Sequence, residues 1–284
     1  MGTLYLVATP IGNLEDITRR AARVLGEVDR VLAEDTRRTG VLLRHLGLGV
    51  PLVSLHGHNE AVRTEQVMAW LGDGEDLALV SDAGTPLVSD PGARLVRAAT
   101  KAGHAVVPLP GPSAVLAALV SSGLSADRFV FLGFPPRRGS ERAELLDRVA
   151  GSDETVVLFE APDRLGSLLA DLAGACGEGR RVAVARELTK LHEEVVRGTL
   201  TEALRYYEEN PPRGEVTVVL EPIQENAPDV ADEAAARALA RALVAEGLRP
   251  SHAAREVARR LGLPRNLAYD IVQAIASEGG SHPS

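Results

Sequence analysis

The chain has 284 residues, of which 45% are hydrophobic and 25% are charged, and its formal net charge is −8. This composition is ordinary for a soluble globular protein long enough to form two domains. Its single cysteine, Cys176, excludes an intramolecular disulfide and a cysteine-rich zinc site and fits a reducing cytoplasm. No apolar stretch approaches the roughly 18 residues of a membrane span, so we expect neither secretion nor membrane insertion.

The charge is unevenly distributed along the chain. The net negative charge argues against nonspecific binding to nucleic acid, which depends on neutralising phosphates. Between residues 249 and 265, however, there are five arginines against one glutamate. A locally basic tail on an acidic body is a pattern linked to nucleic-acid contact, and its alternative is a solvated helix face.

The first 121 residues alternate between runs of apolar β-forming residues and helical periodicity. Strands are predicted at 4–8, 30–33, 52–55, 77–81 and 105–108. Helices are predicted between them, for example at 61–71 and 93–102. Near-continuous apolar strands separated by helices predict an α/β domain with a mostly parallel sheet covered on both faces.

A second α/β domain is predicted at 122–222, and a helical module follows it. The strands of this second domain are expected at 129–132, 155–159, 181–185 and 215–220, and its helices near 165–175 and 200–208. Residues 223–231 lack periodicity and are predicted to be a linker. The last part, 232–284, contains helix patterns at 232–246, 251–261 and 267–277, and 254–263 is similar to the first helix and turn of a helix-turn-helix.

Three loops rich in glycine and proline follow strands of the first domain, at 9–14, 82–92 and 110–114. In an open α/β sheet, ligands bind beyond the carboxyl ends of the strands, where glycine lets the backbone approach the ligand. We therefore predict one shared pocket, with Asp82 facing a ligand hydroxyl or ammonium and Gly84 leaving room for backbone contact. The alternative is that this loop only starts a helix. The usual nucleotide-binding fingerprints are missing.

Polar segments follow the second and third strands, at 34–37 and 56–60, and place side chains on the rim of the predicted pocket. Asp35, and His58 or Asn59, have the alternative role of capping the next helix. His56 and His58 lack a third partner, so we predict no metal. In the second domain, Lys190 stands out in a chain with only two lysines, as a functional ammonium or an ordinary surface residue.

Six segments together resemble the small-subunit ribosomal RNA methyltransferase I family of the tetrapyrrole methylase superfamily. They are 9–14, 34–37, 81–92, 110–114, 186–190 and 213–215. The similarity covers essentially the whole chain. One departure lies at 133–138, where the family pattern has leucine in place of Pro135.

The resemblance implies two α/β domains of the class III methyltransferase type that hold S-adenosylmethionine between them, in a cytoplasmic homodimer. It implies methylation of the 2′-hydroxyl of a cytidine in the decoding centre of 16S rRNA, within the 30S subunit. The residues it implies for the cofactor are Pro10, Gly12, Asp82, Ala83, Gly84, Ser113, Ala114, Ala185 and Gly214. Those it implies for the RNA are Arg37, His56, His58, Asn59, Glu60, Arg255 and Arg259.

A ribose hydroxyl is a poor nucleophile at neutral pH, so a base or a nearby cation is expected to assist the reaction. The candidates are Glu34, Asp35 and Lys190. Two alternatives remain at this stage. One is a methyltransferase of the same fold that acts on a precorrin-type tetrapyrrole or on a diphthine precursor. The other is a noncatalytic RNA-binding factor in ribosome assembly.

Overall fold

The computed structural model describes residues 1–223, 230–246, 248–261 and 265–278. The chain divides into two compact units, Met1–Ile223 and Gln224–Ser284. Residues 224–229 of the predicted linker lie outside the described residues. The division of the first unit at residue 121 stays a prediction, although its two sheets are separate in the order of their strands.

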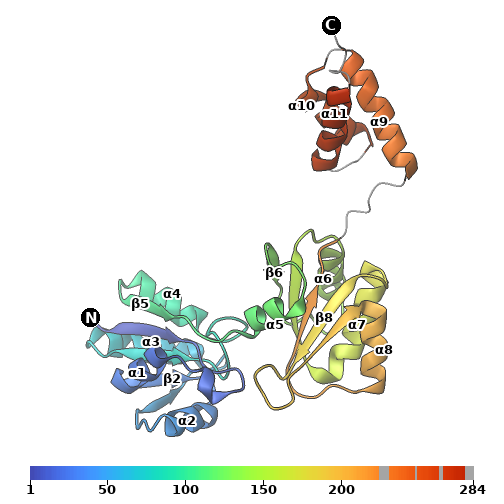
Figure 1. Ribbon diagram of the computed structural model, residues 1–284. Helices are drawn as coiled ribbons and strands as arrows, with labels where there is room; N and C mark the ends of the chain where they lie inside the picture. Colours follow the sequence, from blue (N-terminus) through green and yellow to red (C-terminus); the bar gives the residue numbers. More distant parts are fainter. Residues whose placement is uncertain (224–229, 247, 262–264, 279–284) are drawn as a thin grey trace. The chain divides into compact units, whose positions relative to one another are not determined.

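The first sheet is entirely parallel, as predicted, with strand order β3-β2-β4-β1-β5 (Figure 1). Its strands are β1 (Thr3–Val7), β2 (Arg30–Ala33), β3 (Leu52–Ser54), β4 (Leu77–Val80) and β5 (Ala105–Leu109). Its helices are α1 (Arg19–Glu27), α2 (Thr36–His45), α3 (Glu60–Gly72) and α4 (Ala93–Lys101).

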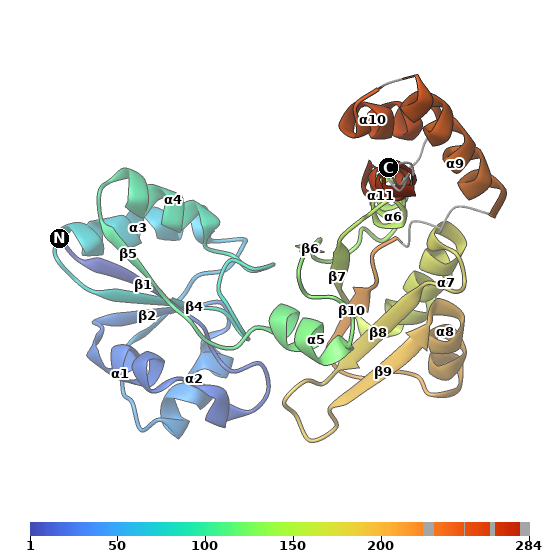
Figure 2. The ribbon, with the colours of Figure 1, turned by 45° about the horizontal axis from the view of Figure 1, so that its top comes forward.

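Alternate residues of these strands point into two separate cores. In β4, Ala78 and Val80 pack with α1 and α2, whereas Leu77 and Leu79 pack with α3 and α4 (Figure 2). Because both faces of the sheet are covered, its strands are mostly apolar, and β4 is apolar along its whole length. This arrangement leaves the carboxyl ends of the strands, with their loops, free to form a site.

The second sheet has the order β6-β7-β10-β8-β9, in which only β6 and β7 pair in parallel. Its strands are β6 (Phe129–Phe131), β7 (Thr155–Glu160), β8 (Arg181–Arg186), β9 (Glu194–Thr199) and β10 (Val216–Leu220). Sequence reasoning missed β9. It is an edge strand with no fully buried residue, so it carries no alternating apolar pattern.

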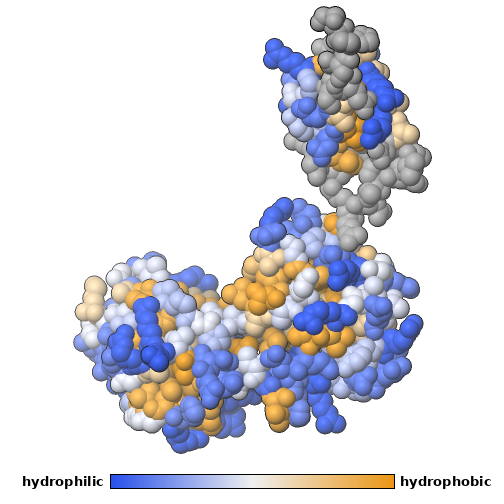
Figure 3. Space-filling model, in the orientation of Figure 1, coloured by the Kyte–Doolittle hydropathy of each residue, from blue (hydrophilic) through white to orange (hydrophobic). Residues whose placement is uncertain are grey.

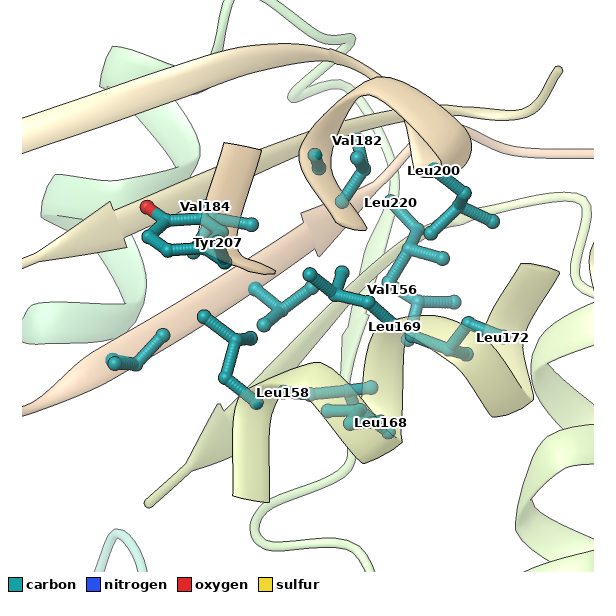
Figure 4. Close-up of a cluster of buried hydrophobic side chains, with 14 of the residues drawn as sticks. Val156, Leu158, Leu168, Leu169, Leu172, Val182, Val184, Leu200, Tyr207 and Leu220 are labelled. Atoms are coloured by element: carbon teal, nitrogen blue, oxygen red, sulfur yellow. The ribbon is translucent and has the colours of Figure 1, made fainter. Parts of the chain in front are cut away.

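Helices cover both faces of the second sheet. On one face, α7 (Leu165–Cys176) and α8 (Leu200–Glu209) pack against Val156, Leu158 and their neighbours (Figure 4). On the other face, α5 (Ala114–Ser122) packs against Val157, Ala183 and Val219. A further helix, α6 (Ser140–Ala150), follows β6 and packs against α7.

The second unit contains the three predicted helices, α9 (Val230–Ala245), α10 (Pro250–Leu261) and α11 (Arg265–Glu278). Their core consists mainly of alanine, valine and isoleucine, including Ala240, Val257 and Val272. Small side chains allow short helices to pack closely, so this unit has a core of its own. Among the helices of the described residues, none has the length and apolar character that crossing a membrane requires.

Candidate active site

Backbone and side-chain hydrogen bonds join the three glycine loops of the first sheet. Thr9 and Gly84 exchange two backbone hydrogen bonds, of 2.9 and 3.0 Å. The Thr85 hydroxyl donates to the carbonyl of Pro112 at 3.2 Å. The loops meet because β1 lies between β4 and β5, which places the ends of all three strands side by side.

These loops contribute to one pocket of about 450 Å³, as predicted, and the second sheet supplies its other wall. A volume of this size suits a small-molecule ligand. The residues from the first sheet and α5 are Ile11, Glu34, Arg38, Asp82, Ala83, Gly84, Thr85, Val88, Ser89, Asp90, Ser113, Ala114 and Val115. Those from the second sheet and its loops are Phe134, Phe159, Glu160, Ala161, Pro162, Gly214, Glu215, Val216 and Thr217.

Three carboxylates of the first domain converge on this pocket: Glu34, Asp82 and Asp90. Asp82 accepts a hydrogen bond from the backbone N–H of Asp35 at 2.9 Å, and Arg38 lies 3.6 Å from its other oxygen. Burial, together with the charge of Asp82, raises the pKa of Glu34. The site therefore holds Glu34 in an environment that favours proton uptake.

Asp90 is a pocket residue that sequence reasoning did not select. Burial raises its pKa to about 6, helped by the charges of Glu34 and Asp82 and opposed by a hydrogen bond to Ser81. The neighbouring Leu87 and Ser89 adopt left-handed backbone conformations, with φ of 76° and 66°. Such strain in residues other than glycine is concentrated at functional sites. The sequence signal that could have identified Asp90 is its position in the same glycine- and proline-rich loop as Asp82.

Asp35 and Arg37 have local partners instead of pocket positions. The Asp35 side chain caps α2 by accepting from the backbone N–H of Arg37 at 2.8 Å, the alternative considered for it. Hydrogen bonds from the Arg37 side chain and backbone lower the pKa of Asp35 to about 2. The Arg37 side chain is 89% exposed, so a large ligand can reach it.

The segment 56–60 organises the start of two helices. Asn59 precedes α3 without a side-chain capping bond, and its Oδ1 accepts from the backbone N–H of His56. The Glu60 carboxylate accepts from the backbone N–H groups of Gly92 and Arg94, at the start of α4. His58 is exposed, and its ring centroid lies 6.0 Å from that of His56. The segment thereby braces the loop that carries Asp90.

His56 is notable for a buried ring nitrogen, Nδ1, that has no hydrogen-bond partner among the described residues. It lies close enough to Glu34 to lower the pKa of that carboxyl through its charge. Within the described parts of the chain, no group of three or more His, Cys, Asp or Glu side chains is arranged to hold a metal ion.

Lys190 lies in the loop between β8 and β9. Its Nζ donates to Glu187 at 2.8 Å and to Glu215 at 3.2 Å. Burial acts to lower the pKa of Lys190, but the hydrogen bonds and charges of these two carboxylates raise it. Lys190 therefore stays charged and holds the pocket residue Glu215 in place.

Of four predicted cofactor residues, Pro10, Gly12, Ala185 and Gly214, only Gly214 lines the pocket. A Cβ on Gly12 would overlap the Lys190 side chain at Cγ. Ala185 belongs to the core beneath α5. A Cβ on Gly214 would overlap the carboxylate of Glu187, so glycine is required there for that carboxylate to approach. The other five, Asp82, Ala83, Gly84, Ser113 and Ala114, line the pocket.

In the second unit, Arg255 is exposed on α10. The side chain of Arg259 lies outside the described residues.

Two family models match the chain. The tetrapyrrole (corrin/porphyrin) methylases match residues 3–204. A domain described as "RsmI C-terminal HTH domain" matches residues 230–276.

Several curated relatives named ribosomal RNA small subunit methyltransferase I are similar to the chain over nearly its whole length. The protein from Synechocystis is 47% identical over 280 residues, which cover 98% of this chain and 100% of the relative. The protein from Xylella fastidiosa is 46% identical over 270 residues, covering 94% and 98%.

Solved structures share the fold of the first unit. Uroporphyrin-III-C-methyltransferase from Thermus thermophilus is 26% identical with a TM-score of 0.55, over 77% of this chain and 94% of that one. A cobalt precorrin-4 methyltransferase is 19% identical with a TM-score of 0.60, covering 77% and 94%, which shows the fold alone.

Proposed function

Because the chain belongs to the tetrapyrrole methylase family, in the branch of its ribosomal RNA small subunit methyltransferase I relatives, we propose that it methylates 16S rRNA. The proposed reaction transfers a methyl group from S-adenosylmethionine to the 2′-hydroxyl of a cytidine in the decoding centre. The observation that carries this proposal is full-length similarity to these relatives, the C-terminal helical domain included.

The pocket residues fit S-adenosylmethionine. Gly84 has a φ of +82°, and a Cβ there would lie 3.3 Å from Ile11 and narrow the space. The carboxylates of Asp82 and Glu215 suit a ligand with a sulfonium and an ammonium group. When bound, this cofactor supplies a methyl group on a positively charged sulfur. The chain would hold it through the loops at Asp82–Gly84 and Ser113–Ala114 and through the wall at Gly214.

We assign the proton of the attacking hydroxyl to Glu34 and Asp90 acting together. Both line the pocket, the charge of Asp82 raises the pKa of each, and the charge of Glu34 further raises the pKa of Asp90. A base is most effective when its pKa lies near the operating pH. Because the charge of Glu34 acts on Asp90, the protonation of Asp90 depends on that of Glu34.

Other candidates support this centre. Asp35 has a pKa far too low for a base and anchors the start of α2. Lys190 stays protonated and positions Glu215. We place Arg37 and the segment 56–60 toward the RNA, together with Arg255 and Arg259 of the helical domain.

The partners proposed are the 30S subunit and a second copy of the chain, in the cytoplasm where that RNA lies. Support for a homodimer comes from α5, on which Leu116 and Val120 are exposed one turn apart. Figure 3 shows apolar surface over the part of the first unit that contains this helix. Exposed apolar side chains that gather in this way mark interaction surfaces.

The test uses purified protein, methyl-labelled S-adenosylmethionine and 30S subunits that lack the modification. Nuclease digestion and mass spectrometry then locate the label. We expect it on the ribose of a single cytidine in 16S rRNA. Label on a base, on protein or nowhere in the subunit would contradict the proposal, and transfer to a tetrapyrrole would favour the alternative of the same fold.

A further inference from the structure

One wall of the pocket presents a phenyl ring to solvent. Among the residues that line the pocket, Phe134 and Phe159 carry aromatic rings, and Phe134 is 56% exposed. Its ring is tilted against that of Phe159, with 5.4 Å between the centroids. Phe159 in turn packs edge-to-face on Phe131 at 4.8 Å. Phe134 is therefore an exposed end of a row of three contacting rings, in a chain that contains only four phenylalanines.

The loop that carries Phe134 is held from below by a buried ion pair. Arg164 donates to the carbonyl of Pro135 at 2.7 Å and pairs with Glu160 at 2.7 Å. The Glu160 side chain is 0% exposed and also accepts from the backbone N–H of Ala161. An ion pair whose carboxylate is removed from solvent holds its loop in a defined position.

A second arginine holds the next residue of the loop. Arg142 donates to the carbonyl of Pro136 at 2.8 Å and to Asp171 at 2.8 Å. On the other side, Gly133 has a φ of +68°, and its carbonyl accepts from the backbone N–H of Phe159 at 2.9 Å. These bonds fix the loop on both sides of Phe134, so the exposed ring is preorganised and does not depend on a ligand to order it.

The proposed reaction brings the flat base of a nucleotide close to the pocket that Phe134 lines. The base of a nucleotide is attached to the carbon next to the one that bears the 2′-hydroxyl. A nucleotide whose hydroxyl reaches Glu34 and Asp90 therefore brings its base close to the same pocket, of which Phe134 lines one wall. In RNA such a base has left its stack, and proteins commonly replace the lost stacking with an aromatic side chain.

We propose that Phe134 is the stacking platform for the base of the target nucleotide. This inference rests on the proposed function. It assigns to the ring a role in recognising the methyl acceptor, while the donor is held at the glycine loops and Gly214. Stacking on a phenyl ring tolerates any base, so Phe134 supplies affinity and orientation, and the choice of cytidine falls to polar groups.

The test compares Phe134→Leu and Phe134→Tyr with the wild type. Leucine keeps an apolar side chain and removes the ring, whereas tyrosine keeps the ring. We expect kcat/KM for undermethylated 30S subunits to fall about 10- to 100-fold in F134L and to stay within about 3-fold in F134Y. Calorimetry should give an unchanged Kd for S-adenosylmethionine in both variants, which also shows that they are folded.

Phe129→Leu is the matched control, because Phe129 is partly exposed on β6 and does not line the pocket. Its activity should equal that of the wild type. The inference is overturned if F134L is as active as the wild type, or if F134Y loses as much activity as F134L. It is also overturned if F134L weakens donor binding by the factor that it lowers activity, since the ring would then contact the donor. If the wild type places no label in 30S RNA, the proposed function fails and this inference fails with it.

Discussion

Thr9 and Gly84, 75 positions apart in the chain, form a two-residue antiparallel bridge beyond the ends of the parallel strands β1 and β4. The bridge ties the first glycine loop to the second. It turns the backbone of Gly84 toward the pocket in a left-handed conformation that other residues rarely adopt. The pocket floor is thus made by main chain, and a side chain introduced there enters the ligand space.

Replacing Gly84 by tryptophan should therefore abolish donor binding. We expect Gly84→Trp to raise the Kd for S-adenosylmethionine by at least about 100-fold, because several contacts of a preformed pocket are lost together. Calorimetry measures the change. Gly74→Trp is the control, since Gly74 also has a positive φ but nothing lies within 4 Å of its Cβ position. Equal affinities of the two variants for S-adenosylmethionine would show that the donor does not bind in this pocket.

Loss of either proposed proton acceptor should slow the reaction more than it weakens donor binding. We expect Glu34→Gln and Asp90→Asn each to lower kcat by about 100-fold or more, the usual contribution of a general base. The Kd for the donor should change by less than about 10-fold. Asp147→Asn, at an exposed site on α6, should have wild-type activity. Full activity in both pocket variants would show that the proton leaves by another route.

Asp90 should also make the free energy of unfolding depend on pH. Its pKa is raised to about 6 in the folded protein from an ordinary value of 3.8. Between these values the folded state binds more protons than the unfolded state, so stability falls as pH rises from about 4 to about 6. Asp90→Asn should remove this fall and be more stable than the wild type at pH 7. Urea unfolding at several pH values checks this, and parallel curves for the two proteins would argue against it.

The buried pair beneath the Phe134 loop should matter for stability. Arg164→Met leaves the carboxylate of Glu160, 0% exposed, without its partner. We expect a loss of about 3–5 kcal/mol in the free energy of unfolding, measured by urea denaturation. Arg23→Met breaks an exposed pair with Glu27 on α1, with side chains 60% and 57% exposed, and should cost less than about 0.5 kcal/mol. A loss in Arg164→Met as small as that in Arg23→Met would mean that the Glu160 pair contributes little to the free energy of unfolding.

The helical domain should contribute to RNA binding and not to donor binding. Because Met1–Ile223 is a compact unit that contains the whole pocket, a chain ending at Ile223 should bind S-adenosylmethionine with unchanged affinity. Its kcat/KM for 30S subunits should fall at least about 10-fold, since the arginines of α10 are lost. Filter binding and methylation assays measure the two properties. A truncated protein with full activity would exclude this role for the domain.

Local patterns in the sequence were sufficient for much of the fold. The apolar strands of the first sheet, such as Leu77–Val80, predicted their own parallel arrangement, because a strand buried on both faces is apolar throughout. The glycines and prolines of the loop at 82–92 predicted a ligand-binding pocket. The edge strand β9 had no such signal, since its residues are only partly buried.

The amino-acid sequence by itself determined the first sheet, the three helices of the tail and the glycine loops at the strand ends, since each depends on neighbouring residues. Only the tertiary structure decided which carboxylates share the pocket. Glu34 and Asp35 are adjacent in the chain, yet Glu34 lines the pocket while Asp35 caps α2. Asp90 joins Glu34 because β4 lies beside β2, and Phe134, which follows β6 of the second sheet, lines the same pocket. Strand order and loop conformation decide which side chains share the pocket, and both depend on contacts between residues far apart in the chain.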